Sequence, residues 1–227
     1  MASSPRAIVM VSSSIYGMQN LLNQVYAVLK GYGYTVWMSH KGTIPIDSSK
    51  SNFDNCLDAV DNCNVFLGII TGRYGTGQVA GQLSITHQEA QRAILRDKPR
   101  FFLVHRDVTI ARDLLRQYRF DKDGNRLPLA FRRTGVLDDL RILDLYDEVV
   151  KDAEPLPERR GNWAQPYFYE PDVLQFLRTQ FADVDRIQAM LTITEDAAKT
   201  ADPKTDGNPK TEDGESDANG DDNASTS

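Results

Sequence analysis

The stretch that decides the fold is Val65-Phe66-Leu67-Gly68-Ile69-Ile70, which is followed at once by Gly72-Arg73-Tyr74-Gly75. An apolar run without alternation is typical of a strand buried on both faces, as in a parallel sheet. Residues 84–96 have helical character and carry Glu89 near their start. We therefore predict a buried strand, a glycine loop and a helix. Ligands of open α/β sheets bind beside such loops, at the carboxyl ends of the strands.

The same order of strand and helix extends through the first half of the chain. Residues 7–11, 35–38 and 101–104 are short apolar runs typical of strands. Between them, apolar residues recur at helical spacing in residues 21–29 and 53–60. This order predicts an α/β fold with a parallel sheet and right-handed crossovers.

Beyond residue 105 the pattern predicts helices joined by charged and proline-rich connections. Helices are expected over residues 108–118 and 136–150, and another begins at Glu170-Pro171-Asp172. Residues 154–165 are predicted to be a connection between them. We divide the chain into three parts: an α/β core (1–110), a helical extension packed on it (111–190) and an acidic tail (191–227).

The negative charge of the chain is concentrated in the tail. Residues 195–227 hold ten acidic residues and three lysines, a net charge of −7, while the whole chain has −6. They contain no Val, Ile, Leu, Met or aromatic residue. Such a segment buries too little apolar surface to offset its chain entropy, and we predict that it is disordered. The near-neutral body shows no basic stripe, so we expect no nucleic-acid partner.

Cysteine usage and hydropathy predict a cytoplasmic protein without membrane contact. No apolar run is long enough to span a bilayer, and the N-terminus lacks the pattern of a signal peptide. Cys56 and Cys63 are expected on one helix, too far apart for a disulfide. The scattered histidines and cysteines lack metal-ligand spacing, and we expect no metal.

Polar residues and glycines gather at the predicted carboxyl edge of the sheet. The glycine loop could hold a phosphate against its backbone N–H groups, or it could be a plain surface loop. It lacks the Gly-Lys-Ser/Thr ending of a Walker A loop. Arg73 could pair with a phosphate, and Tyr74 offers a ring face to a base. The expected substrate-binding residues are Ser12, Ser13, Ser14, Gly72, Arg73, Tyr74, Gly75, Ser84 and Thr86.

Several of these residues also have local structural roles. The three serines at 12–14 suit a turn and the N-cap of the helix that follows, and Ser84 and Thr86 are N-cap candidates for the helix bearing Glu89. Glu89 is expected to face the loop or the solvent. A carboxylate there stabilises the helix dipole. It can also act as a nucleophile or stabilise an oxocarbenium ion at an anomeric carbon.

Five motifs resemble those of a family of domains of unknown function. They are Val11-Ser12-Ser13-Ser14, Gly72-Arg73-Tyr74-Gly75, Ser84-Ile85-Thr86-His87-Gln88-Glu89, Asp97-Lys98-Pro99 and Asn162-Trp163-Ala164-Gln165. The resemblance covers roughly residues 5–183, judged by eye. The family is similar in fold to TIR domains and nucleoside deoxyribosyltransferases, and its members often precede STAND-type NTPases. The resemblance implies a flavodoxin-like parallel sheet. It also implies a separately encoded NTPase or effector partner, and self-association.

The resemblance also implies a role for Glu89. This residue matches the catalytic glutamate of the related glycosyl-transferring enzymes, although Gly81-Gln82-Leu83-Ser84 stands where the deoxyribosyltransferases usually have an Asp-x-Gly turn. Three functions follow: an N-glycosidic hydrolase acting on a nucleotide such as NAD in antiviral defence or stress signalling, a non-catalytic interaction or nucleotide-sensing module, and a nucleoside 2-deoxyribosyltransferase. In each the nucleotide is a substrate or ligand, and no further cofactor is expected.

Overall fold

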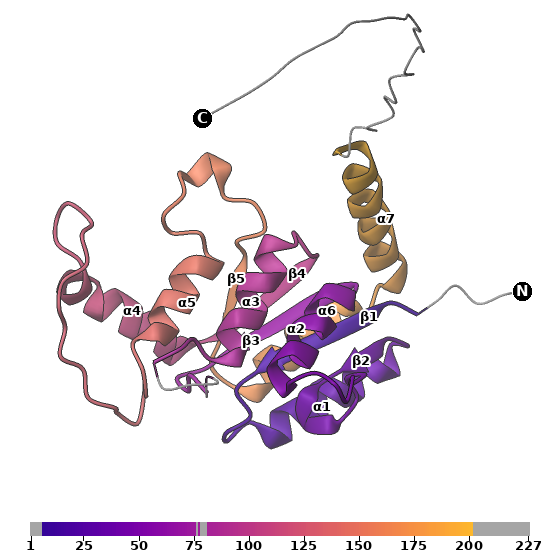
Figure 1. Cartoon of the computed structure of the whole chain (residues 1–227), viewed down its shortest axis with the longest axis horizontal. Helices are drawn as coiled ribbons and strands as arrows, with labels where there is room; N and C mark the ends of the chain where they lie inside the picture. The colour runs from indigo at the N-terminus through magenta and orange to yellow at the C-terminus, as the bar shows by residue number, and fades with distance from the viewer. Residues whose placement is uncertain (1–5, 76, 78–80, 202–227) are drawn as a thin grey trace, which may run out of the picture.

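A five-stranded parallel sheet with strand order β2-β1-β3-β4-β5 forms the centre of the computed structural model, which describes residues 6–75, 77 and 81–201 (Figure 1). The strands are β1 (Ile8–Ser13), β2 (Thr35–Trp37), β3 (Val65–Ile70), β4 (Arg100–His105) and β5 (Ala164–Tyr167). All four neighbouring pairs run parallel. This is the flavodoxin-like order, and the predicted α/β class is confirmed.

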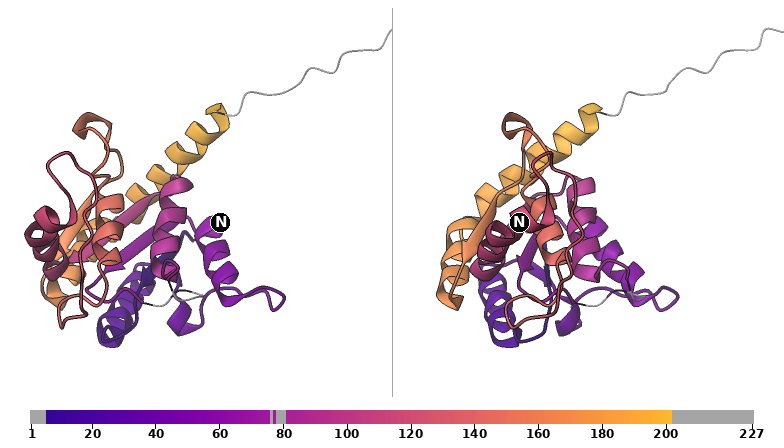
Figure 2. Two further views of the ribbon diagram at one scale, coloured as in Figure 1. Left: turned by 60° about the vertical axis from the view of Figure 1, so that its left-hand side comes forward. Right: turned by 90° about the vertical axis from the view of Figure 1, so that its left-hand side faces the viewer.

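Helices cover both faces of the sheet (Figure 2). On one face lie α1 (Gln19–Gly31), α6 (Glu170–Phe181) and the first half of α7 (Val184–Ala201). On the other lie α2 (Asn52–Asn62), α3 (Ile85–Leu95), α4 (Arg106–Arg119) and α5 (Arg141–Val149). Two short 3-10 helices, η1 (Ser39–Lys41) and η2 (Leu156–Glu158), lie in the connections.

The strands divide the apolar residues between two cores, one for each face of the sheet. Val9 and Val11 of β1 belong to the core with α1 and α6, and Met10 between them belongs to the core with α2 and α3. Successive side chains of a strand point to opposite faces, which produces this alternation. All six residues of β3 are buried. The continuous apolar run of β3 therefore reflects burial on both faces.

The prediction of a connection over residues 154–165 is wrong at its end, where β5 begins at Ala164. This strand pairs with β4 at the edge of the sheet, where Pro166 lies opposite Val104. Proline has no N–H to donate and is tolerated in an edge strand, which pairs on one side only. The extension after residue 110 therefore adds a strand to the sheet as well as helices.

The ends of α1, α2 and α5 differ from those expected. The N-cap of α1 is Met18 rather than a serine, and it has no side-chain capping bond. Helix α5 begins at Arg141 rather than at residue 136, because Thr134 holds the backbone N–H groups of Val136 and Leu137 in a turn. Cys63 is the C-cap of α2 instead of part of the helix, and both cysteines are free.

Helix α7 continues past residue 195, the point at which composition predicts disorder, and ends at Ala201. Residues 202–227, the rest of the predicted tail, lie outside the described residues. None of the helices in the described part of the chain is long and apolar enough to cross a bilayer.

Candidate functional site

The candidate site lies where β1 and β3 run side by side in the middle of the sheet. The helix after β1 crosses to one face of the sheet and the helix after β3 crosses to the other. This change of direction is the topological switch point, beside which α/β sheets of this order bind ligands. Ser12 and Ser13 end β1, and Thr71 follows β3 at the same edge. The expected position of the site at the carboxyl edge of the sheet therefore coincides with the switch point.

Glu89 is turned inward toward this edge instead of facing the loop or the solvent, and it is 5 % exposed. The Ser12 hydroxyl donates a hydrogen bond of 2.5 Å to its Oε2 atom. The Cys56 thiol of α2 lies beside the same carboxyl group. Residues from α3, β1 and α2 thus meet around one buried carboxyl group.

Burial raises the pKa of Glu89 from its usual 4.5 to about 7, although hydrogen bonds from Ser12 and Cys56 act in the opposite direction. The carboxyl group can therefore exchange a proton close to neutral pH. Carboxyl groups tuned in this way are typical of general acids and bases. Burial first, and then the charge of Glu89, raise the pKa of the Cys56 thiol to about 12, so this thiol stays protonated and able to donate.

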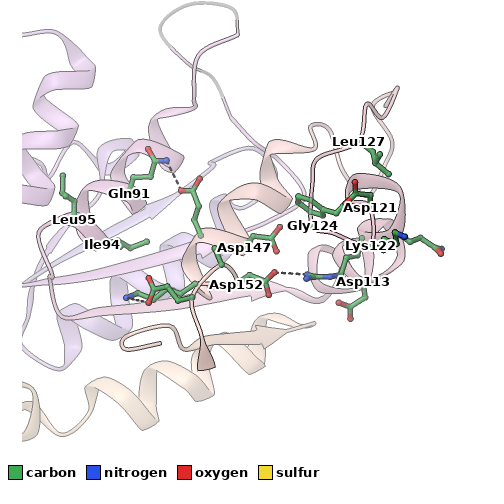
Figure 3. Close-up of a pocket in the computed structure, with 17 residues that line it drawn as sticks. Gln91, Ile94, Leu95, Asp113, Asp121, Lys122, Gly124, Leu127, Asp147 and Asp152 are labelled. Atoms are coloured by element: carbon green, nitrogen blue, oxygen red, sulfur yellow. Dashed lines mark hydrogen bonds and ion pairs between the residues drawn. The ribbon is translucent and has the colours of Figure 1, made fainter. Parts of the chain in front are cut away.

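Among the described residues, one small cavity lies at this edge. Ser14, Arg73, Tyr74 and Thr86 help to line a cavity of about 10 Å³, and Glu89 does not line it. Such a volume holds about one water molecule. A far larger cavity, of about 1440 Å³, lies between α3, α4 and α5 and is also without Glu89 (Figure 3). This larger cavity is therefore separate from the candidate site residues that the sequence predicts.

The loop after β3 is fixed by backbone packing. A Cβ atom on Gly72 would stand 1.8 Å from the carbonyl oxygen of Val136, so only glycine fits there. Gly75 has a φ of 80°, in the left-handed region that favours glycine. Arg73 donates to the carbonyl oxygen of Gly135 at 3.3 Å. Packing against Val136 thus explains why residue 72 is a glycine, without any phosphate.

Besides Ser12, three of the predicted serines have hydroxyl groups with partners within the protein: Ser13, Ser14 and Ser84. Ser84 caps α3 by accepting a hydrogen bond from the backbone N–H of His87 at 3.3 Å, which confirms the expected N-cap. The hydroxyl groups of Ser14 and Thr71 lie 3.0 Å apart and join the ends of β1 and β3. Ser13 donates to the carbonyl oxygen of Ser14 at 3.0 Å.

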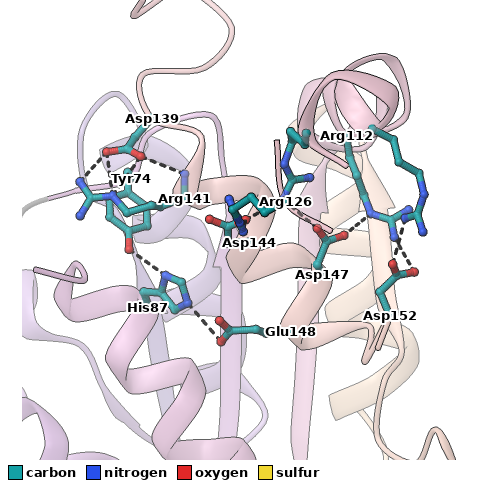
Figure 4. A network of polar contacts seen from close by, with 12 residues as sticks. Tyr74, His87, Arg112, Arg126, Asp139, Arg141, Asp144, Asp147, Glu148 and Asp152 are labelled. Atoms are coloured by element: carbon teal, nitrogen blue, oxygen red, sulfur yellow. Dashed lines mark hydrogen bonds and ion pairs between the residues drawn. The ribbon is translucent and has the colours of Figure 1, made fainter. Parts of the chain in front are cut away.

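A second buried polar cluster adjoins the loop and includes residues that the sequence did not single out (Figure 4). The Tyr74 hydroxyl lies 2.8 Å from His87 Nδ1, and His87 Nε2 lies 3.1 Å from a carboxylate oxygen of Glu148. The Arg141 guanidinium stands 4.5 Å from the centre of the Tyr74 ring. One face of this ring is therefore covered, which leaves less of it for the expected stacking with a base.

Sequence spacing explains part of this arrangement. His87 and Glu89 are two residues apart on α3, so their side chains point in different directions. Glu89 meets Ser12, whereas His87, which is 1 % exposed, meets Tyr74 and Glu148. Glu148 comes from α5, far along the chain, and carries no local motif that would predict this contact. Within the described ranges, no group of three or more His, Cys, Asp and Glu residues is arranged to hold a metal.

The chain matches a family model described as Domain of unknown function (DUF4062) over residues 8–134. The match covers more than half of the 227 residues, so the chain belongs to this family. It includes the serines of β1, the glycine loop and Glu89, and it ends before α5 and β5. No curated protein matches the chain.

Proposed function

We propose that this member of the DUF4062 family is a nucleotide-binding domain that hydrolyses an N-glycosidic bond, such as that of NAD, through Glu89. The observation that carries the proposal is a carboxyl group buried at the switch point of the sheet, held by Ser12 and with its pKa raised to about 7. We place this activity in defence or stress signalling, in the cytoplasm, on the strength of the family resemblance alone.

The chemistry of the bond explains why a carboxyl group suits the role. Breaking an N-glycosidic bond builds positive charge on the ribosyl ring, and a nearby carboxylate stabilises it or attacks the anomeric carbon. Ionised Glu89 would fill this role, while the Ser12 hydroxyl fixes the orientation of the carboxylate. Activity should therefore rise as the pH passes through about 7, where burial places the pKa of Glu89.

Binding would use groups of the loop after β3 and of the start of α3. Within the described part of the chain, the Arg73 side chain makes one long hydrogen bond, to the carbonyl oxygen of Gly135, and could turn to a phosphate. The N-terminus of α3 would add positive potential, with Ser84 and Thr86 at its start. Because the neighbouring cavity holds only about 10 Å³, a nucleotide would have to displace side chains such as Tyr74.

The alternative is a non-catalytic nucleotide-sensing or interaction module that works with a separate NTPase and can self-associate. Two observations favour it: Glu89 is 5 % exposed, and Arg141 covers one face of the Tyr74 ring. In this alternative the same edge binds a nucleotide or a partner without cleaving a bond. Fold alone does not decide between the two.

The test is release of base by the purified full-length protein from NAD and, separately, from deoxynucleosides. We expect nicotinamide release by the wild type and its loss in Glu89→Gln by about a hundredfold or more, because the amide lacks the charge that offsets the oxocarbenium ion. Glu158→Gln, a change of the same kind at an exposed position in η2, should behave as the wild type.

Nucleotide binding is measured together with base release, in order to distinguish a hydrolase from a non-catalytic sensing module. Arg73→Ala should raise KM with little change in kcat, because a phosphate contact acts on the ground and transition states alike. If a nucleotide binds but no base is released, the catalytic proposal fails and the sensing module stands. If no nucleotide binds, this edge is a structural part of an interaction domain.

A further inference from the structure

A large open groove on the α3, α4 and α5 side of the molecule is separate from the proposed nucleotide site (Figure 3). We call it the α3–α5 groove; it is formed by α3, α4, α5, the segment 120–127 and the segment 151–154. Ile94 and Leu95 line it from α3, and Phe120 and Leu127 line it from the segment after α4. Leu95 is 77 % exposed and Leu127 is 38 % exposed. Burial of these apolar side chains would favour an occupant.

The size of the groove favours a polypeptide segment over a small molecule. Its volume is about 1440 Å³, whereas pockets for small molecules measure roughly 300–1,000 Å³. Apolar anchors on one helix and on a facing segment are the arrangement that an amphipathic helix uses when it binds in a groove.

The charges around the apolar residues favour a basic occupant. Six acidic and three basic side chains line the groove, a formal charge of −3. Three of the carboxylates are ion-paired with Arg112: Asp147 at 2.5 Å, Asp152 at 2.7 Å and, more loosely, Asp113 at 3.6 Å. Asp113 nevertheless has a side chain that is 77 % exposed. Glu148 uses its Oε2 atom to accept hydrogen bonds from His87 and Gln91, but its side chain is 41 % exposed. Both carboxylates can therefore still meet a cation from outside.

The acidic end of this chain does not fit the groove. Residues 195–227 carry a net charge of −7 and contain no Val, Ile, Leu, Met or aromatic residue. They would bring neither apolar side chains for Leu95 nor positive charge for Asp113 and Glu148. Residues 195–227 are therefore not the occupant that the groove favours.

We propose that the α3–α5 groove binds an amphipathic helix of a partner protein. The apolar face of that helix lies on Ile94, Leu95 and Leu127, and its lysine or arginine residues pair with Asp113 and Glu148. This surface would serve to recruit a partner whether or not Glu89 is catalytic.

The experiment uses the full-length protein and two synthetic helices of about 18 residues, roughly five turns. Both have the same leucine face, but one has lysines and the other glutamates on its polar face. Fluorescence anisotropy is expected to show binding of the lysine peptide and at least tenfold weaker binding of the glutamate peptide. Leu95→Asn should weaken binding of the lysine peptide by about tenfold or more, since a buried leucine contributes that much.

Leu114→Asn is the matched control, because Leu114 is 64 % exposed on α4 and does not line the groove. It should bind the lysine peptide as the wild type does. Any attraction between the lysine peptide and the acidic tail is the same in both variants and cancels in the comparison. Asp113→Lys should also weaken binding and reduce its dependence on salt.

Three results would overturn the proposal. One is equal binding of the lysine peptide by the wild type and by Leu95→Asn. Another is equal binding of the two peptides. The third is a concentration-dependent dimer, seen by sedimentation and lost in Leu95→Asn, which would assign the groove to a second copy of this chain. Protection of α4 and α5 from hydrogen exchange by the lysine peptide, absent in Leu95→Asn, would support the proposal.

Discussion

Among single residues, Glu89 couples the candidate site to the stability of the protein. The groups that hydrogen-bond to it, Ser12 and Cys56, are neutral donors. Burial therefore favours the protonated form and raises the pKa of Glu89 from 4.5 to about 7. The folded protein binds this proton more tightly than the unfolded chain does. The contribution of Glu89 to stability is thus fully present below about pH 4.5, is lost as the pH rises to about 7, and stays lost above that.

Glu89→Gln should therefore stabilise the protein at pH 8, because the amide needs no ionisation in the buried site. We expect the free energy of unfolding to rise by up to about 3 kcal/mol at pH 8 and to change far less at pH 4.5. Urea unfolding at the two pH values measures the difference. Glu158→Gln provides the control and should show no such dependence. Equal effects of Glu89→Gln at both pH values would mean that Glu89 is not buried as an ionisable group.

The position of Glu89 in the chain could be predicted, but its environment could not. The order of strand, glycine loop and helix placed the residue at the carboxyl edge of the sheet. Its partner Ser12 lies 77 residues earlier. That contact depends on the register of β1 against β3, which no local pattern encodes. The same holds for His87, whose partner Glu148 belongs to a helix 61 residues later.

Among the elements, the loop after β3 shows how a glycine can be required for packing alone. Gly72 accepts a hydrogen bond of 3.0 Å from the backbone N–H of Asp138. The side chain of Asp138 in turn accepts one of 2.8 Å from the backbone N–H of Tyr74. The segment before α5 is thus held directly against the loop, and the Val136 carbonyl oxygen occupies the space of a Cβ atom on Gly72.

Gly72→Ala should force the segment before α5 away from the loop. We expect a loss of stability of about 1–3 kcal/mol, typical of overpacking, and altered exchange of the Tyr74 and Asp138 amides. The measurement is chemical unfolding combined with hydrogen exchange. Gly135→Ala is the control, because a Cβ atom there meets nothing within 4 Å. A Gly72→Ala variant as stable as Gly135→Ala would show that the two segments separate easily.

Some of the strands and helices could be predicted from the sequence more easily than others. The core strands β1, β3 and β4 must bury side chains on both faces, so their apolar runs stand out. Strand β5 pairs on one side only, and of its four residues only Tyr167 is buried. Backbone pairing with β4 holds it in the sheet, and a sequence of mixed polarity containing proline gives little sign of that. Helix α5 was predicted from residue 136, but it begins at Arg141, because the Thr134 hydroxyl holds residues 136 and 137 in a turn.

For the whole molecule, α3 separates two surfaces that could act together. One side of the helix turns Glu89 toward β1, and another presents Ile94 and Leu95 to the α3–α5 groove. Glu148 belongs to both regions, since it lines the groove and its carboxylate accepts a hydrogen bond from His87 beside the loop. A helix bound in the groove would therefore contact Glu148, which hydrogen-bonds to His87 in the cluster that includes Tyr74.

The C-terminal helix divides into a part that belongs to the core and a part that leads away from it (Figure 1). Ile187 is fully buried and Leu191 is 5 % exposed, both in the core with α1 and α6. Beyond Ala201 the sequence has no large apolar residue to add to that core. The stabilising role of the segment after α6 should therefore end within α7.

Two truncations test this division. Removal of residues 202–227 should leave the free energy of unfolding unchanged within about 0.5 kcal/mol, because an acidic segment without apolar residues adds no packing. Removal of residues 184–227 should lower it by roughly 3–5 kcal/mol, since Ile187 and Leu191 leave cavities over α1 and α6. Urea unfolding of the three proteins gives both differences. A large loss on the shorter truncation would show that the acidic segment packs against the body, and composition would then be a poor guide to its structure.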